Sequence, residues 1–305
     1  MLQTYRAHVA ERAALGIPPL PLSAKQTGEF KDLVKSGIAA NMAFFMNDEF
    51  QTTMFQPVGG MDMIGKGFAR QVDRLITYNA KVTKLMQDKK GVSITYTDLV
   101  KGGTVTAEAE FCVCTIPLTV LSQIETNLSD KKTAAIQAVP YSNSVKIGLE
   151  MRRRFWEEDS QIYGGISWTD QDILQLWYPP HAFHQQKGIM LGSYQWDTAV
   201  AERWAQLKPA ERLVKAIAEG EKIHPGYGGM VEKGLSVAWS KVPYMFGCSA
   251  EWSDAARAQH YPTLVAAEGA HYMVGDQISF HGGWQEGAIR SAHRVIEDIA
   301  RRVAA

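Results

Sequence analysis

Two adjacent glycines and a tryptophan precede a helical pattern near the end of the chain. They are Gly282, Gly283 and Trp284, within the segment GDQISFHGGWQEGAIRSAHRVIEDI. Glycine has no side chain, so a pair of glycines lets the backbone approach a flat or bulky molecule closely. The first N–H groups of a helix are unpaired and carry partial positive charge. The arrangement predicts a binding site for a ligand that is not protein; a core position for Trp284 at a helix start is the alternative.

A single lysine stands within a strand-like alternation at residues 144–151, SVKIGLEM. One face of that strand would carry the apolar residues Val145, Ile147, Leu149 and Met151. The other face would carry Lys146 with Ser144 and Gly148. A lysine on such a face is ordinarily a solvated charge, and the residues alone favour that interpretation.

The cysteines and histidines show no sign of a disulfide framework or a metal site. Cys112 and Cys114 lie in the apolar run EFCVCTIPL, and we expect both to be buried thiols in a strand. His271 and His281 lack ligand-like spacing with other candidate ligands, so we predict no metal site.

Composition argues against several classes of partner. The chain of 305 residues is 46% hydrophobic, enough for a large core, and Lys plus Arg equals Asp plus Glu at 32 each. We therefore expect neither nucleic acid nor an anionic membrane as a partner. The chain has no apolar run of membrane-spanning length and no signal-peptide pattern at its start, which predicts a cytoplasmic location unless a partner or precursor carries a signal. The run Arg152–Arg154 is interpreted as a solvated face.

The elements that must position these residues follow from periodicity. Residues 1–54 are predicted to be mainly helical, with a break at Ile17–Pro21. From Gln56 onward, GGMDMIGKGFARQVDRLI predicts a glycine turn followed by a helix. Four short runs rich in β-branched residues come next, and we expect them to form one meander: KVTKLMQ, GVSITYTD, GTVTAEA and EFCVCTI.

The second half of the chain mixes helical and strand patterns. LSDKKTAAIQAV predicts a short helix, and TAVAERWAQLKPAERLVKAIAEGEKI predicts helix with a break near Pro209. SVKIGLEM, GIMLGSYQW and HYMVGD predict strands. A last helix is expected from Trp284 to Val303, with these residues facing inward: Ala288, Ala292, Val295, Ile296 and Ile299. The predicted fold class is α+β / α/β.

Three blocks of the sequence resemble the flavin-dependent amine oxidase superfamily. PVGGMDMIGKGFARQV with AKVTKL is similar to the segment in which a Gly-Gly pair approaches flavin and a later strand clamps adenine. SVKIGLEMRRRFWEED is similar to the strand that carries the family's lysine near flavin N5. AWSKVPYMFGCS and GDQISFHGGWQEGAI resemble the C-terminal flavin segment, and GGMD and GWQEGA point toward bacterial L-amino acid oxidases.

The resemblance implies FAD as the cofactor and a partial FAD-binding domain interleaved with a mixed-sheet and helical substrate-binding domain. Residues 1–54 would be a helical part of the substrate domain and 121–235 its main part. Residues 55–120 and 236–305 would be the central and C-terminal parts of the FAD-binding domain. The implied cofactor-binding residues are Gly59, Gly60, Met61, Val82, Trp239, Cys248, Gly275, Asp276, Gly283, Trp284, Gln285 and Ala288.

Some of these residues have a more definite role in the family. The backbone of Val82 would bind adenine, and Asp276 would lie near the ribityl and pyrophosphate groups; a plain strand valine and a turn aspartate are the alternatives. The amides of Gln285–Gly287 would face the charge of reduced flavin around N1 and O2. Trp284 would form an aromatic wall beside the substrate, as a second catalytic residue with Lys146.

The resemblance gives Lys146 the role of holding a water near flavin N5, with a pKa lowered by burial. Trp239 and Cys248 are nine positions apart, as are the family's flavin-edge tryptophan and the cysteine that monoamine oxidases attach to flavin. Ser249 follows Cys248 where monoamine oxidases have an aromatic residue. An unattached thiol is therefore favoured over a covalent link, and an amino acid oxidase over a monoamine oxidase.

The sequence contains no strand–GxGxxG–helix unit, although the family begins with one. We expect a second polypeptide to carry that unit; a processed or truncated portion of a longer precursor and a non-catalytic remnant are the alternatives.

The predicted function is the flavin-contacting and substrate-binding subunit, or fragment, of an FAD-dependent L-amino acid oxidase. With molecular oxygen it would convert an amino acid to an imine and keto acid, with ammonia and hydrogen peroxide as further products. The alternatives are a monoamine or polyamine oxidase subunit and a non-catalytic scaffold or binding subunit. Abundant aromatic residues are compatible with a substrate that has a large apolar side chain.

Overall fold

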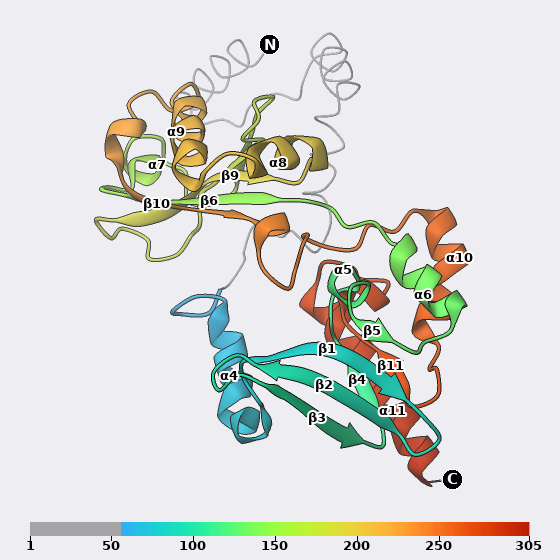
Figure 1. Ribbon diagram of the computed structural model, residues 1–305. Coiled ribbons are helices and arrows are strands. Elements are labelled where there is room, and N and C mark those ends of the chain that lie inside the picture. The colour runs from blue at the N-terminus through green and yellow to red at the C-terminus, as the bar shows by residue number, and fades with distance from the viewer. Residues whose placement is uncertain (1–55, 305) are drawn as a thin grey trace, which may run out of the picture. The chain divides into compact units, whose positions relative to one another are not determined.

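The computed structural model describes residues 56–304 of the chain (Figure 1). The chain divides into two compact units, Met1–Ile64 and Gly65–Ala305, and each is described by itself. The helices predicted for residues 1–54 lie outside the described residues.

The described part of the first unit is the predicted glycine turn. Gly60 N–H donates to the Pro57 carbonyl at 3.1 Å. Gly59 and Gly60 have φ values of +95° and +109°, in the left-handed region that glycine adopts without strain. Helix α4 (Asp62–Val72) and the short helix η3 (Asp73–Leu75) follow.

One sheet of the second unit is an antiparallel meander with a short parallel strand added. Its strands are β1 (Ala80–Gln87), β2 (Val92–Asp98), β3 (Thr104–Ala109) and β5 (Glu125–Thr126), in the order β3-β2-β1-β5. β2 and β3 are rich in β-branched residues, and in the sheet β1 pairs with β2 and β2 pairs with β3 (Figure 1). The meander is therefore confirmed for three of its four predicted runs.

The fourth run forms a separate pair. Strand β4 (Cys112–Cys114) lies parallel to β11 (His271–Met273). The prediction of a four-run meander was wrong because β preference indicates an extended run without indicating its partner. Both cysteines of β4 are buried, as predicted, and burial raises the pKa of the Cys112 thiol to about 12.

The second sheet has five antiparallel strands in the order β10-β6-β9-β8-β7. They are β6 (Val145–Met151), β7 (Ile166–Trp168), β8 (Gln175–Trp177), β9 (Gly188–Gln195) and β10 (Val231–Ala238). Strand β6 alternates between buried and half-buried residues, so its apolar side faces a core and its other side is more open.

Three helices cover the apolar face of this sheet (Figure 1). They are α7 (Phe155–Glu158), α8 (Thr198–Ala205) and α9 (Pro209–Gly220). The helical stretch breaks before Pro209 as predicted, because proline lacks an N–H group and is tolerated at the first position of a helix. The core between helices and sheet includes Ile147, Leu149, Trp156, Met190 and Trp204.

A second core is formed by side chains of the meander, of the β4–β11 pair and of nearby helices. Helices α5 (Leu118–Leu121), α6 (Asp130–Ala138) and α10 (Asp254–Val265) contribute to it. Its fully buried members include Leu85, Leu118, Leu121, Leu264, Met273 and Ile278. The residues of this core come from two stretches of the chain, 85–139 and 250–278. The five-stranded sheet is formed by the residues between them.

Helix α11 (Gln285–Ala304) buries a narrower stripe than predicted. Its buried residues are Gly287, Ser291 and Val295, and Ile299 packs against buried Tyr272 and Val274. Ile296 was predicted to face inward but is 58% exposed. A spacing of four residues defines the buried stripe, and Ile296 lies about 100° around the helix from Val295.

The run Arg152–Arg154 is not one solvated face. Arg154 is 2% exposed, and its Nε donates to Glu157 at 2.7 Å. Arg153 is partly exposed and pairs with Glu158 and Asp159. The interpretation failed for Arg154 because α7 starts immediately after it and places Glu157 where a buried ion pair can form.

Candidate functional site

Lys146 lies on the open face of the five-stranded sheet, as the alternation predicts. Its partner across β9 is Tyr194, and the Lys146 ammonium nitrogen lies 4.1 Å from the centre of the Tyr194 ring. The side chain is half-buried, and burial lowers the pKa of the Lys146 ammonium below its ordinary value. The nearby Cys248 thiol partly offsets that shift. Lys146 is therefore not the solvated charge of the simpler interpretation.

Aromatic side chains continue from Tyr194 across the same sheet. The Tyr194 and Trp196 rings are stacked, with centroids 6.0 Å apart and an interplanar angle of 16°. The Trp177 ring lies 5.9 Å from Tyr194, and the Trp168 ring lies 6.2 Å from Trp196. We call these four residues the aromatic face; they could pack against an apolar molecule beside Lys146.

Trp239 and Cys248 are the two ends of a loop tied to the chain segment that leads into β6. Trp239 N–H donates to the Ser144 carbonyl at 2.9 Å, and Cys248 N–H donates to the Ser142 carbonyl at 2.7 Å. Trp239 begins the short helix η5 (Trp239–Lys241). The structure thus brings both residues to the end of β6 at which Lys146 stands.

Residues 275–284, which precede α11 and are called the glycine segment, are held by one of their own side chains and by one of α11. An Asp276 carboxylate oxygen accepts from Gly283 N–H at 2.9 Å, and the Ser291 hydroxyl accepts from Gly275 N–H at 2.9 Å. Asp276 begins the short helix η6 (Asp276–Ile278). Trp284 is 44% exposed, so the structure does not place it in a core.

The first turn of α11 requires a glycine at position 287, and its first backbone N–H groups precede the first hydrogen bond of the helix. A Cβ added at Gly287 would lie 2.2 Å from the His281 carbonyl oxygen and 2.3 Å from the Ser279 hydroxyl. Ala288 N–H donates to the Trp284 carbonyl at 3.3 Å. The amides of Gln285–Gly287 come before this bond, as the first amides of a helix do, and they can bind negative charge.

Gln277 is a functional candidate that the sequence did not indicate. It is 4% exposed, and its side chain oxygen accepts from Leu118 N–H at 3.0 Å and from the Tyr141 hydroxyl. Its side chain nitrogen donates to the Ile116 carbonyl at 3.0 Å. Gln277 thus fixes the glycine segment to α5, across a sequence separation that no local pattern could reveal.

The loop of Cys248 and the glycine segment come together. Tyr141 and Ala250 form an isolated β-bridge, and a Cβ added at Gly282 would lie 3.9 Å from the Ala250 carbonyl oxygen. The region around Lys146 and Cys248 is therefore continuous with the region around Gly282 and Trp284. Two groups of predicted residues, distant in sequence, form one candidate site.

Val82 lines a groove of about 650 Å³. Tyr244 and Phe246 also line it, and both have positive φ values, of 66° and 53°, which non-glycine residues seldom adopt. The Thr119 hydroxyl holds this loop by donating to the Met245 carbonyl at 2.7 Å. Val82 thus lines the same groove as the middle of the loop that runs from Trp239 to Cys248. Gly59, Gly60 and Met61 belong to the other unit, where they form the glycine turn.

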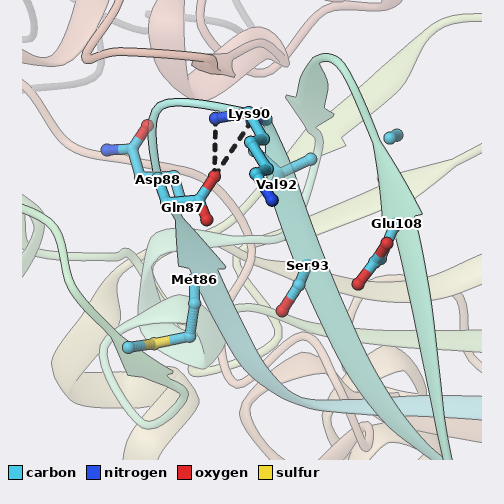
Figure 2. A pocket seen from close by; sticks show the side chains of 9 residues that line it. Met86, Gln87, Asp88, Lys90, Val92, Ser93 and Glu108 are labelled. Atoms are coloured by element: carbon cyan, nitrogen blue, oxygen red, sulfur yellow. Dashed lines mark hydrogen bonds between the residues drawn. The ribbon is translucent and has the colours of Figure 1, made fainter.

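A second concavity, of about 370 Å³, lies at the turn between β1 and β2 (Figure 2). Figure 2 shows Asp88 at this turn, where its carboxylate accepts from the N–H groups of Lys90 and Gly91. Glu108 reaches the same place from β3. It contains none of the predicted site residues, and its hydrogen bonds are those of a turn.

Within residues 56–304, no three His, Cys, Asp or Glu side chains are grouped so that they could hold a metal ion. Over the same residues, every helix is too short or too polar to cross a membrane.

Several curated proteins resemble the chain. The L-amino-acid oxidase of Siganus canaliculatus is 28% identical over 265 residues, which are 84% of this chain and 49% of that protein. The putative L-amino-acid oxidase YobN of Bacillus subtilis strain 168 is 29% identical over 81% of this chain and 52% of that protein. The chain therefore spans about half the length of the curated relatives it matches.

Solved structures share the fold. A triple mutant of putrescine oxidase, redesigned in its cofactor binding, superposes with a TM-score of 0.70 at 18% identity over 80% of this chain and 53% of its own. Cyclohexylamine oxidase from Brevibacterium oxydans IH-35A superposes with a TM-score of 0.69 at 17% identity over 81% of this chain and 53% of its own. The predicted amine oxidase-like fold is confirmed.

A family model described as flavin containing amine oxidoreductase matches residues 14–300. The match covers all three blocks on which the sequence resemblance rests, and it confirms the prediction of FAD as the cofactor. This chain belongs to the flavin containing amine oxidoreductase family.

Proposed function

We propose that the chain is the flavin-contacting and substrate-binding part of an FAD-dependent L-amino acid oxidase. The position of Lys146 carries the proposal: it is half-buried beside Tyr194 and close to Cys248. Relatives named L-amino-acid oxidase support an amino acid as substrate. The products are an imine, which water hydrolyses to a keto acid and ammonia, and hydrogen peroxide from molecular oxygen. In this proposal, residues 1–54 and 121–235 belong to the substrate-binding domain, and residues 55–120 and 236–305 belong to the FAD-binding domain.

The segment Gly275–Ala288 fits one side of a flavin ring. Gly283 has a φ of +79°, and among the described residues no atom lies within 4 Å of the position its Cβ would take. A flat ring can approach the backbone there, and the amides of Gln285–Gly287 would stabilise negative charge on it. Residues of this segment would hold the flavin ring, and FAD bound there would supply the chemistry of hydride acceptance from the substrate Cα and electron transfer to oxygen.

Lys146 holds a water and moves a proton at its side chain nitrogen. A lowered pKa makes the neutral amine accessible nearer neutral pH, and the Tyr194 ring fixes the position of the nitrogen. Trp284 forms a wall that orients the substrate, since hydride loss depends mainly on proximity and alignment. Cys248 stays an unattached thiol in this proposal.

Val82 and its groove would hold the adenine end of FAD. The groove is lined by several apolar side chains and by residues 79–83 at the start of β1, which suits a planar base. Thr119 and the loop residues Tyr244 and Phe246 would connect this end to the flavin end at Cys248.

A second polypeptide with a strand–GxGxxG–helix unit would complete the FAD site. Strand β4 pairs only with β11 among the described strands, and parallel sheets of two strands are rare because both faces need cover. Val113 is 37% exposed between two buried cysteines. Since Cys112 N–H donates to the Ala270 carbonyl, the backbone groups of Val113 point to the other edge of β4. A further parallel strand would fit that edge.

The aromatic face favours an amino acid with a large apolar side chain as substrate. Its Tyr194 ring lies beside Lys146, the Trp196 ring stacks on Tyr194, and Trp196 is 39% exposed. Solved neighbours named putrescine oxidase and cyclohexylamine oxidase give the second candidate, an amine without a carboxylate. A non-catalytic scaffold is the third.

Flavin absorbance and peroxide formation distinguish these functions. The chain is expressed with and without a polypeptide that carries the dinucleotide-binding unit, supplied with FAD, and assayed with L-phenylalanine, L-tryptophan, putrescine and cyclohexylamine. A yellow complex that forms peroxide with the amino acids supports the proposal. Peroxide from the amines alone establishes the second candidate, and a complex without flavin or turnover establishes a scaffold.

A further inference from the structure

Three side chains near α10 bind three successive carbonyl groups of the glycine segment. Trp252 Nε1 donates to the Gln277 carbonyl at 3.1 Å. The Tyr261 hydroxyl donates to the Ile278 carbonyl at 3.4 Å. Arg257 Nη1 donates to the Ser279 carbonyl at 3.1 Å. The backbone that leads to Gly282 and Gly283 is therefore held residue by residue by a different part of the chain.

Arg257 is the centre of this arrangement. Its guanidinium carbon lies 5.3 Å from the Trp252 ring centre, 5.1 Å from the Tyr261 ring centre and 5.0 Å from the Phe280 ring centre. Phe280 is 74% exposed and belongs to the glycine segment, and the Arg257 cation links its ring to α10. The Tyr261 and Phe280 rings also touch, with centroids 4.9 Å apart.

The contacts of Arg257 continue to the start of α11. Ser279, whose carbonyl Arg257 binds, is buried, and its hydroxyl accepts from His281 N–H at 2.8 Å. The same hydroxyl lies against Gly287 in the first turn of α11. A shift of Ser279 must therefore move either the Gly282–Gly283 turn or the helix amides that follow it.

We propose that Arg257 is a positioning residue for the flavin. It fixes Ser279 and Phe280, so that the glycine turn and the amides of Gln285–Gly287 stand where the ring binds. This inference rests on the proposed function, because it assigns the flavin to that segment. Arg257 itself does not contact the ring and donates no proton to it.

The test compares Arg257→Met with a matched variant, Arg302→Met. Arg302 also lies over an aromatic ring, Phe111 at 5.3 Å, and donates to a backbone carbonyl, that of Gly269. It lies near the end of α11, far along the helix from the glycine segment. Each substitution removes a guanidinium that lies over aromatic rings and donates to a backbone carbonyl; Arg257 lies over three rings, while Arg302 lies over one and also donates to the Tyr272 hydroxyl. Arg302→Met therefore controls for the loss of a cation–ring contact outside the glycine segment.

Hydrogen exchange of the isolated chain gives the first readout. Arg257→Met should speed exchange of the amides at 277–284, and Arg302→Met should leave them unchanged. In the flavin-loaded assembly, Arg257→Met should weaken FAD binding by about tenfold and shift the visible flavin spectrum. Arg257→Lys, which keeps a cation and one donor, should restore part of both effects.

Two outcomes overturn the inference. Equal exchange at 277–284 in Arg257→Met and wild type would show that Arg257 does not position the segment. Faster exchange with FAD affinity and spectrum as in wild type would show that Arg257 is a purely structural arginine. Absence of flavin from the wild-type assembly overturns the proposed function instead, and the exchange result then decides separately whether Arg257 holds the segment.

Discussion

Lys146 and Tyr194 are directly opposed on neighbouring antiparallel strands, with the ammonium nitrogen 4.1 Å from the ring centre. The ring supports a cation there, while burial opposes it, and the net effect of the surroundings is a lowered pKa of Lys146. In the function proposed above, this lysine would exchange a proton with a bound water.

Lys146→Met should slow turnover with oxygen by about 10²–10⁴-fold, because the side chain would no longer position a water or move a proton. Oxygen consumption by the flavin-loaded assembly measures it, and anaerobic flavin bleaching by the substrate should change much less. The control is Lys187→Met: Lys187 is 47% exposed and pairs with Glu232. Unchanged oxygen consumption in Lys146→Met would remove the assigned role.

Asp276→Ala should raise the dissociation constant for FAD by about fivefold, because Gly283 N–H loses its acceptor and the glycine turn loosens. Asp276→Asn keeps an acceptor oxygen and should bind nearly as wild type does. Titration of FAD fluorescence measures both. Asp298→Ala, at an exposed ion pair with Arg301, is the control. Equal affinities in the alanine and asparagine variants would argue against the hydrogen bond as the cause.

Val113→Pro should abolish binding of the second polypeptide while the chain itself stays folded. The N–H group of Val113 points to the open edge of β4, and proline removes that donor without breaking the β4–β11 pair. Co-purification measures the first effect and circular dichroism the second. Val105→Lys, at a similarly exposed valine on β3, is the control. A complex that forms normally with Val113→Pro would mean that the partner does not pair with β4.

His271 should make the chain sensitive to acid. It is fully buried, and burial with the Lys132 charge lowers its pKa from 6.5 to about 4, against the opposing effect of Glu268. Between these values the unfolded chain binds more protons than the folded one, so stability is complete above pH 6.5 and falls as pH decreases toward 4. The loss amounts to about 3 kcal/mol.

Urea unfolding of wild type and His271→Gln at pH 7.5 and pH 4.5 tests this pH dependence. The glutamine variant should lose less stability than wild type between the two pH values, because its side chain does not titrate. An equal loss in both proteins would show that other groups cause the acid sensitivity.

The sequence determined the individual elements of the fold and several of their faces. Alternation in residues 144–151 predicted the strand, its buried face and the opposite placement of Lys146, all of which the structure has. The EFCVCTI run predicted buried thiols at Cys112 and Cys114 correctly. Such features depend on periods of two or 3.6 residues, which are visible in any short stretch.

Only the tertiary structure decided which elements meet. It paired β4 with β11 instead of the meander, set Tyr194 opposite Lys146, and left Ile296 exposed. It also brought Arg257 of α10 to the carbonyl of Ser279. These contacts join residues that are far apart in the chain, and their choice depends on register and shape complementarity summed over the whole core. No local pattern of residue types contains that information.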